Sequence, residues 1–290
     1  MTSRTIPTYQ RPASFADIET GPEGEETIRR FTKDFKAFDE LKVISALKRD
    51  YVTARDEVKG PGFIAGKLKD LREQHSAAEA EYWGSAFDKA ALNPLTGRIL
   101  AIGVRRDGKN IINVAENDKE ERDILAEFLD HHTEMKSQDG VICGFNWEGF
   151  DHGFIRTRCQ KHRLPWQQLQ QGRYMDSTFR DLMHDFTGHD RTKFVSLDTL
   201  NDFLETGVRK NGDGAHFFQV FKDDRPKAID YLANDLLMTE ACAVGLGVTP
   251  KREYDLSVTE PADDIPFDAT PSVRRALPEP ARERGMAASL

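Results

Sequence analysis

The sequence has few cysteines and no long apolar run. Its three cysteines, Cys143, Cys159 and Cys242, are far apart and form no CxxC pair. A sparse, odd number of cysteines is typical of reduced thiols in a cytosolic protein, so we expect a cytoplasmic location. No apolar stretch approaches the roughly 20 residues that a membrane helix needs, and the N-terminus lacks the apolar core of a secretory signal. We therefore expect no membrane partner.

The sequence also lacks an excess of positive charge. Its formal net charge is -8 at pH 7, whereas a protein that binds nucleic acid by phosphate neutralisation alone is usually basic. The charge therefore argues against a nonspecific DNA-coating protein. It does not argue against a nuclease, because carboxylates that hold divalent cations add negative charge and the cations then attract phosphate.

The middle of the chain has the pattern of an α/β domain. Apolar residues and turn signals predict five strands, over 14–20, 98–104, 110–115, 141–145 and 173–176. Helical spacing and capping residues predict helices over 121–135, 150–162, 196–204 and 228–244. Strands and helices in this order predict an α/β fold with a mixed sheet flanked by helices.

Two segments differ from this pattern. Residues 23–90 are rich in charged residues and alanine, and we interpret them as a helical insertion after the first strand, broken near Gly60–Gly62. Its apolar residues at helical spacing include Ile28, Phe31, Phe35 and Phe38. From residue 249 the chain is rich in proline and charge and poor in apolar residues, which predicts disorder. We therefore expect an N-terminal extension (1–13), a domain (14–248) that contains the insertion, and a tail (249–290).

The first strand carries two acidic residues. Asp17 and Glu19 are two residues apart, so on a strand their side chains leave the same face. Two such carboxylates repel each other unless a cation lies between them, and Mg²⁺ prefers oxygen ligands of this kind. Short D-x-E patterns are common, and the alternative is a surface strand with two solvated acids.

Two more acidic residues stand at positions that favour a site. Asp151 follows the buried strand 141–145 and begins a helix, and ligands of α/β sheets bind at the carboxyl ends of strands. The alternative is a helix cap, which stabilises a helix by roughly 1 kcal/mol. Tyr231 and Asp235 are four residues apart and share one face of the last helix. Here the alternative is a core tyrosine and an ordinary surface acid.

The order of these motifs resembles that of a known family. D-x-E on a first strand, N-x4-D at a strand-to-helix junction (Asn146 to Asp151) and Y-x3-D on a last helix resemble the DEDD (DnaQ-like) 3′–5′ exonucleases, which have the ribonuclease H-like fold. The tyrosine places the resemblance with the DEDDy subgroup, since a histidine member would need His at position 230. The segments 94–103, 196–200 and 209–214 are also similar to the exonuclease domain of family B DNA polymerases.

The resemblance implies a two-metal-ion 3′–5′ exonuclease that uses Mg²⁺ or Mn²⁺ and releases 5′-mononucleotides, in DNA repair or replication. Asp17, Glu19 and Asp235 would hold the ion that activates the attacking water, and Asp17 with Asp151 would hold the second. Tyr231 would orient the water. The partner would be the 3′ end of a nucleic acid, with single-stranded DNA favoured over RNA.

Five residues are candidates for substrate contacts. Thr20 and Gly21 are expected to meet the terminal nucleotide by analogy with the family. Lys210 is interpreted equally well as a phosphate contact or a solvated lysine. Phe150 could approach a base, although a core position is favoured, and Asn146 would hold its turn or touch the substrate.

Several alternatives stay open at this point. They are an RNA-trimming exoribonuclease, an endonuclease of the same fold, and a non-catalytic nucleic-acid-binding module. The insertion could clamp substrate, act as a lid or bind a replication or repair protein. His131 and His132 are interpreted as surface or boundary residues, and Trp147 as a packing residue.

Overall fold

The computed structural model describes residues 11–53, 62–170, 177–212, 214 and 217–249. Five strands form one mixed sheet in the order β3-β2-β1-β4-β5. They are β1 (Ala13–Pro22), β2 (Gly97–Arg106), β3 (Lys109–Val114), β4 (Val141–Gly144) and β5 (Phe179–Asp181). The first three strands are antiparallel neighbours, while β1, β4 and β5 run parallel. The predicted five-stranded mixed sheet is confirmed.

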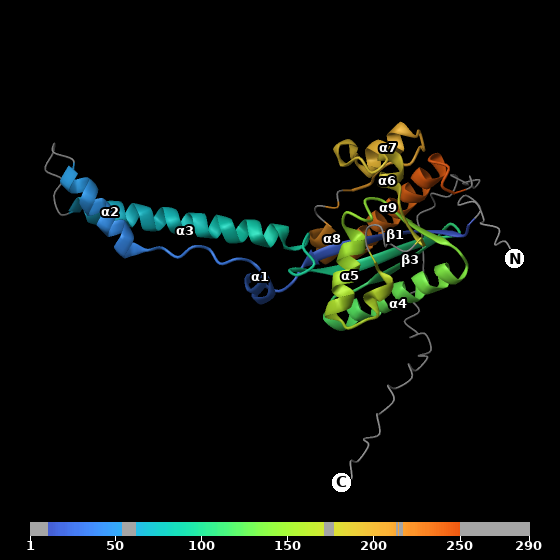
Figure 1. The fold of residues 1–290 in the computed structure, drawn as a ribbon, viewed down its shortest axis with the longest axis horizontal. Coiled ribbons are helices and arrows are strands. Elements are labelled where there is room, and N and C mark those ends of the chain that lie inside the picture. The colour runs from blue at the N-terminus through green and yellow to red at the C-terminus, as the bar shows by residue number, and fades with distance from the viewer. Residues whose placement is uncertain (1–10, 54–61, 171–176, 213, 215–216, 250–290) are drawn as a thin grey trace, which may run out of the picture. The chain divides into compact units, whose positions relative to one another are not determined.

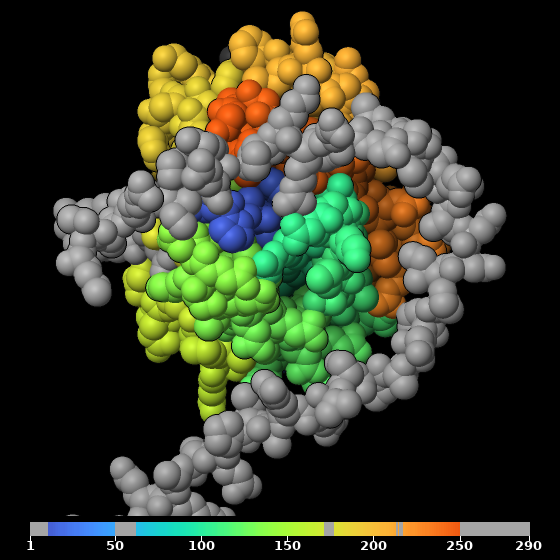
Figure 2. Space-filling view, turned by 90° about the vertical axis from the view of Figure 1, so that its right-hand side faces the viewer, coloured from blue at the N-terminus to red at the C-terminus, as the bar shows by residue number. Residues whose placement is uncertain are grey.

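Helices cover both faces of the sheet (Figure 1). On one face lie α4 (Asp118–Ser137) and α5 (Asp151–Lys161). The other face carries α6 (Leu182–Thr187), α7 (Leu197–Phe203), α8 (Phe217–Asp223) and α9 (Arg225–Gly245). Two short 3-10 helices lie at Trp166–Gln168 and Arg191–Lys193. In Figure 2 the start of β1, in blue, lies between the green residues of α4 and the orange to red residues of α9. The sheet is therefore the middle of three layers.

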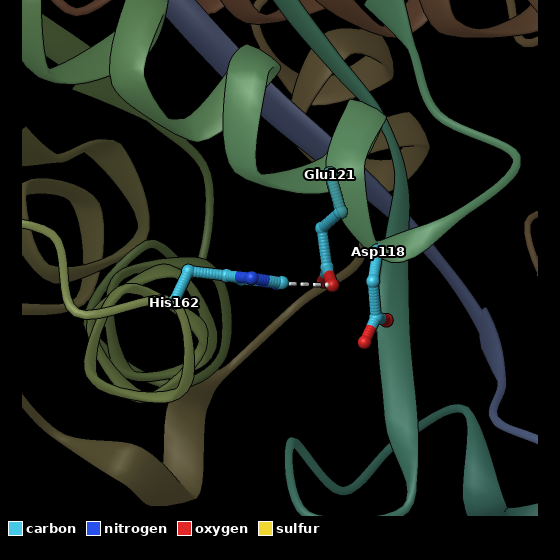
Figure 3. Close-up of side chains that lie close together, drawn as sticks. All are labelled: Asp118, Glu121 and His162. Carbon is cyan, nitrogen blue, oxygen red and sulfur yellow. Dashed lines mark hydrogen bonds and ion pairs between the residues drawn. The ribbon is translucent and has the colours of Figure 1, made fainter.

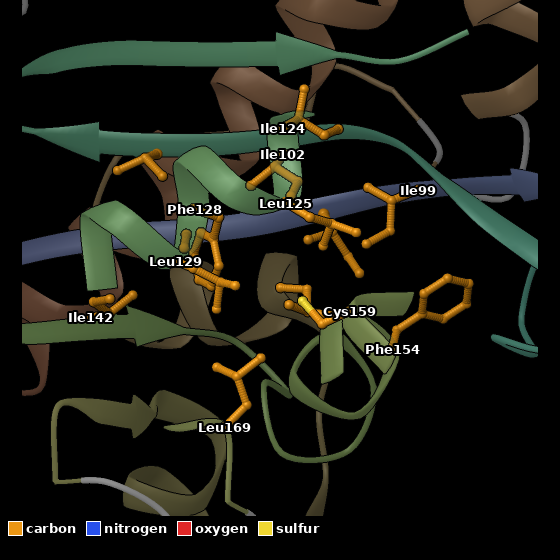
Figure 4. Packing of buried hydrophobic residues seen from close by; sticks show 14 of the residues in the cluster. Ile99, Ile102, Ile124, Leu125, Phe128, Leu129, Ile142, Phe154, Cys159 and Leu169 are labelled. Atoms are coloured by element: carbon orange, nitrogen blue, oxygen red, sulfur yellow. The ribbon is translucent and has the colours of Figure 1, made fainter. Parts of the chain in front are cut away.

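Apolar burial against α4 and α5 fixes one face of the sheet (Figure 4). Trp147 is fully buried there, with its ring centroid 5.7 Å from that of Phe179, so it packs in the core as the sequence favours. His132 is buried too and stacks on Phe179 at 4.7 Å, so its interpretation as a surface or boundary residue is wrong. It lies four residues after Phe128, on the same apolar stripe of α4. His131 is half-buried and hydrogen-bonds Ser14 Oγ.

The insertion is helical, but its first helix is shorter than the spacing predicts. It contains α1 (Glu25–Phe31), α2 (Glu40–Thr53) and α3 (Gly62–Ala90). Residues 33–39 are not helical, and Phe35 and Phe38 instead pack their rings 5.0 and 5.2 Å from His75 of α3. Aromatic contacts across the insertion thus outweigh local spacing, and the periodicity through Phe38 does not mark one helix.

Other boundaries differ from the sequence pattern or lie beyond what is described. The fifth strand is β5 at Phe179–Asp181, whereas the segment 173–176 where it was predicted lies outside the described residues. β5 has only three residues, too few for an alternating pattern to reveal it. The predicted tail also lies outside the described residues apart from Thr249, so the domain boundaries stay predictions. Within the described ranges, no helix is long and apolar enough to cross a bilayer.

Candidate functional site

The sheet and α9 bring the first acidic residues together. Asp17 and Glu19 pair with Gly103 and Ala101 of β2, so the neighbouring positions carry little bulk. Gly103 allows α9 to pack closely there, because a Cβ atom would lie 2.7 Å from the Leu236 side chain of α9. This close packing of α9 on β2 places Asp235, the residue before Leu236, over the acids of β1.

Four carboxylates gather at this point. Asp17, Glu19 and Asp235 each offer a carboxylate oxygen, and these three oxygens all lie within 4.8 Å of one another. Asp151 joins them from the start of α5, hydrogen-bonding Asp17 and accepting the Ile18 backbone N–H at 3.2 Å. Asp151 therefore faces β1 and does not cap its helix, whose N-cap is Phe150. The structure brings together all four acids that the sequence singles out.

A tight turn aims Asp151 at the strand. Asn146 adopts a left-handed backbone conformation, with φ of 55°, and its carbonyl accepts the N–H groups of Gly149 and Phe150 at 3.0 and 3.1 Å. A Cβ atom on Gly149 would lie 2.2 Å from the Asn146 side chain. Asparagine tolerates this backbone region better than most residues. Asn146 thus holds the turn, which was one of the two roles considered for it.

The electrostatics of the cluster favour neutralisation. Burial and the charge of Asp235 raise the pKa of Asp17 from 3.8 to about 7. Burial, together with Asp17, also raises the pKa values of Glu19 and Asp151 well above their usual range. Like charges in a buried site disfavour joint ionisation. A bound cation would relieve this cost, because it balances the negative charges.

The donor set fits a divalent cation. Asp235 Oδ1 is buried and accepts no hydrogen bond from the described residues. A buried carboxylate oxygen without a partner is costly, and a cation would satisfy it. The neighbouring ligands are all carboxylates, the oxygen donors that Mg²⁺ and Mn²⁺ prefer.

Tyr231 lies beside Asp235, one turn earlier on α9. It is almost fully buried, and its hydroxyl donates to Asp235. Burial and the negative charge of Asp235 raise the pKa of Tyr231, so the phenol stays protonated and acts as a donor. Burial also raises the pKa of Asp235, and the hydrogen bond from Tyr231 offsets part of that effect.

The segment before α8 covers the tyrosine. Lys210 places its Nζ 5.6 Å from the Tyr231 ring centroid, and its charge lowers the pKa values of Asp17, Glu19 and Asp235. A Cβ atom on Gly212 would lie 2.6 Å from the Tyr231 ring, and one on Gly214 would lie 2.9 Å from its hydroxyl. Sequence reasoning did not assign these two glycines a role; the G-x-G spacing before the Y-x3-D motif was the available signal.

The other proposed substrate residues lie around this cluster. Thr20 donates its hydroxyl to the Ala91 carbonyl at 2.8 Å, which ties β1 to the end of the insertion. Gly21 is buried at the end of the same strand. Phe150 packs against the core, its ring 5.4 Å from that of Phe154. Phe150 thus has the core position that the sequence favours.

A second group of possible metal ligands, Asp118, Glu121 and His162, has a different character (Figure 3). Glu121 is fully buried and accepts hydrogen bonds from the Arg158 guanidinium, the Ile99 N–H and His162. Burial alone would raise the pKa of Glu121, but the bonds from His162 and Arg158 outweigh it and lower the pKa to about 2. This group already contains its counter-ion, and we interpret it as a structural ion-pair network.

Comparisons with known proteins identify the superfamily of this chain. No curated protein matches the sequence significantly. Among solved structures, a family B DNA polymerase from the hyperthermophilic archaeon Pyrobaculum calidifontis is similar, with 22% identity and a TM-score of 0.47. That similarity covers 55% of this chain but only 23% of the polymerase. A family model of the RNase H superfamily matches residues 89–234, just over half of the sequence. The chain therefore belongs to the RNase H superfamily.

Proposed function

We propose that this protein is a metal-dependent 3′–5′ exonuclease of the DEDDy type that acts on single-stranded DNA in repair or replication. Membership of the RNase H superfamily supports a nuclease. The observation that carries the finer proposal is the convergence of Asp17, Glu19 and Asp235 within 4.8 Å, with Asp151 hydrogen-bonded to Asp17.

Each side chain of the site has a proposed role in hydrolysis. Asp17, Glu19 and Asp235 would hold one divalent cation, and Asp17 with Asp151 a second. When bound, such ions stabilise the charge on the attacking and leaving oxygens of a phosphodiester. The Tyr231 hydroxyl, held by Asp235, would orient the attacking water. The products would be a 5′-mononucleotide and a strand shortened by one residue.

Lys210 supports the same arrangement. Its ammonium group lies over the Tyr231 ring, and its charge lowers the pKa values of three of the acids. A mobile cation at the edge of a carboxylate cluster can contact a phosphate oxygen of the substrate. We therefore propose Lys210 as a phosphate contact, with Thr20 and Gly21 beside the terminal nucleotide.

The decisive experiment compares four substrates with the pure protein in Mg²⁺ or Mn²⁺. They are a 5′-labelled linear DNA single strand, the same strand closed into a circle, its duplex, and an RNA of the same sequence. We expect a ladder that shortens from the 3′ end of the linear DNA, no cleavage of the circle, and no reaction in EDTA.

Variants test the assignment of the site. Asp17→Asn keeps the size of the side chain but removes its charge, and we expect it to lose nearly all activity. Asp123→Asn, which changes an exposed acid on α4, is the matched control and should remain active. Full activity of the Asp17 variant would refute the site. Cleavage of the circle would instead indicate an endonuclease, preference for the RNA an exoribonuclease, and binding without cleavage a non-catalytic module.

A further inference from the structure

An open hollow of about 460 Å³ adjoins the end of β1. Its walls come from the last residue of β1, from α1 and α3 of the insertion, from the start of β2 and from α8. The side chains that matter here are Ile28, Phe87, Arg98, Phe218 and Lys222. Two of them, Ile28 and Phe87, belong to the insertion, which has no part in the four-acid cluster.

The hollow lies beside the strand that carries Asp17 and Glu19, because Pro22 of β1 lines it. The pairing of β1 with β2 shifts register between Glu19 and Thr20, and the next residue, Gly21, faces α8. At Gly21 a Cβ atom would lie 2.8 Å from the Phe218 ring and 2.6 Å from Leu100. The absence of a side chain thus lets Phe218 approach the strand, about 7 Å beyond Glu19 at the rise of a β-strand. Phe218 therefore stands between the acids and the hollow.

The hollow offers an aromatic surface beside positive charge. Lys222 is exposed, places its Nζ 4.1 Å from the Phe218 ring centroid, and has no carboxylate partner among the described residues. Arg98 donates to the Glu116 carbonyl, while its buried Nε has no partner in the described ranges. These groups suit a base and its phosphate, because bases stack on aromatic rings and cations follow the backbone of a single strand.

The acids that line the hollow are already neutralised. Glu23 pairs with Arg158 and Lys161 at 2.6 and 2.7 Å. Glu25 pairs with Arg29 at 2.8 Å. The unpaired charge of the lining is therefore positive, in a protein whose net charge is negative.

We propose that this hollow is a subsite for a nucleotide upstream of the one being released, and that the insertion supplies one of its walls. The base would stack on Phe218, and Lys222, a flexible side chain, would leave the ring and donate to the adjacent phosphate. Ile28 is almost completely buried, and Arg29 stacks on Trp83 of α3 at 4.4 Å, so this wall is anchored. The inference rests on the proposed exonuclease function and extends it to substrate length.

The test measures binding separately from cleavage. Asp17→Asn protein in Mg²⁺ is titrated with thymidine 5′-monophosphate, which fills only the terminal site, and with short oligothymidylates, which also reach the hollow. Phe218→Leu, Lys222→Ala and Phe87→Leu are added to this background. Lys109→Ala, an exposed lysine at the turn between β2 and β3, is the matched control.

We expect Phe218→Leu to weaken oligothymidylate binding by about fivefold to a hundredfold, the range for losing one base–aromatic stack. Affinity falls as salt rises, and Lys222→Ala should make the slope of log affinity against log salt less steep by roughly 0.7, the value for one phosphate contact on a single strand. Phe87→Leu should also weaken oligomer binding. Monophosphate binding should not change in any of them, which excludes a general loss of folding.

Two outcomes separate this inference from the proposed function. Unchanged oligomer affinity in the Phe218 and Lys222 variants, when the protein with Asp17 intact degrades DNA, would overturn the subsite and leave the exonuclease proposal standing. Selective loss of oligomer affinity in these variants, when the protein with Asp17 intact also fails to cleave, would support the binding site and refute the catalytic proposal. An equal loss of monophosphate binding would also overturn the subsite, because the effect would not be upstream.

Discussion

Replacing Asp17 with asparagine should stabilise the protein against unfolding when divalent cations are absent. In the folded chain burial and the charge of Asp235 raise the pKa of Asp17 from 3.8 to about 7, although a hydrogen bond with Asp151 opposes the rise. The unfolded chain has no such neighbours. Ionisation of this carboxyl is therefore much less favourable in the folded protein, and asparagine, similar in shape and uncharged, avoids that cost.

The pH dependence follows from the direction of the pKa change. Because the folded pKa is the higher one, the folded protein binds the proton more tightly. Below about pH 4 Asp17 is protonated in both the folded and the unfolded protein, so it does not reduce the free energy of unfolding. Between pH 4 and 7 the free energy of unfolding falls, and above pH 7 the full cost is present. Moving a pKa from 3.8 to about 7 corresponds to at most about 4 kcal/mol.

Urea unfolding in EDTA measures this effect. At pH 8 the Asp17→Asn variant should exceed the wild type by up to about 4 kcal/mol, and the difference should shrink at pH 5. Adding Mg²⁺ should stabilise the wild type and have less effect on the variant. Asp123→Asn should behave as wild type at both pH values. A variant no more stable than wild type at pH 8 in EDTA would refute the crowded cluster.

Other substitutions address the parts around the acids. Tyr231→Phe should lower kcat by up to about a hundredfold, the low end of the range for groups that assist proton transfer, without changing Mg²⁺ affinity by calorimetry. Gly212→Ala should also lower kcat, because its methyl group would press on the Tyr231 ring. Gly84→Ala, with open space around it, should leave the rate unchanged. Glu121→Ala should lower the free energy of unfolding in urea by about 3–5 kcal/mol. It removes a carboxylate partner from the Arg158 guanidinium, which is buried. A decrease of less than about 1 kcal/mol would contradict this expectation.

The sequence predicts the parts of the fold that rest on local signals. Asp107 and Gly108 form the turn between β2 and β3, with φ of 53° and 78°, which is the backbone that an Asp-Gly hairpin requires. Ser196 caps α7 by accepting the Thr199 N–H at 3.1 Å. Each of these features depends on neighbours in sequence, so a pattern of a few residues is enough to reveal it.

Features that depend on distant contacts escaped prediction. Phe35 and Phe38 continue a helical spacing, yet they pack against His75, some forty residues away. β5 is held by pairing with β4 and not by its own propensity. The close approach of Phe218 to Gly21 is likewise not visible in the sequence, because the ring reaches the strand from α8. Tertiary packing decides each of these cases.

The contrast between two acidic groups shows what a motif leaves undecided. Asp17-x-Glu19 and Asp118-x-x-Glu121 are both short acidic patterns, and both lie in groups whose ligand atoms are close enough to hold a metal. Around Glu121, Arg158 and His162 supply the positive partners and the pKa falls to about 2. Around Asp17 the neighbours are acids, the pKa rises to about 7, and one oxygen of Asp235 has no hydrogen-bond partner in the described residues. Because a cation is favoured where negative charge is unbalanced, the Glu121 group does not require one, and the proposed chemistry belongs to the Asp17 group.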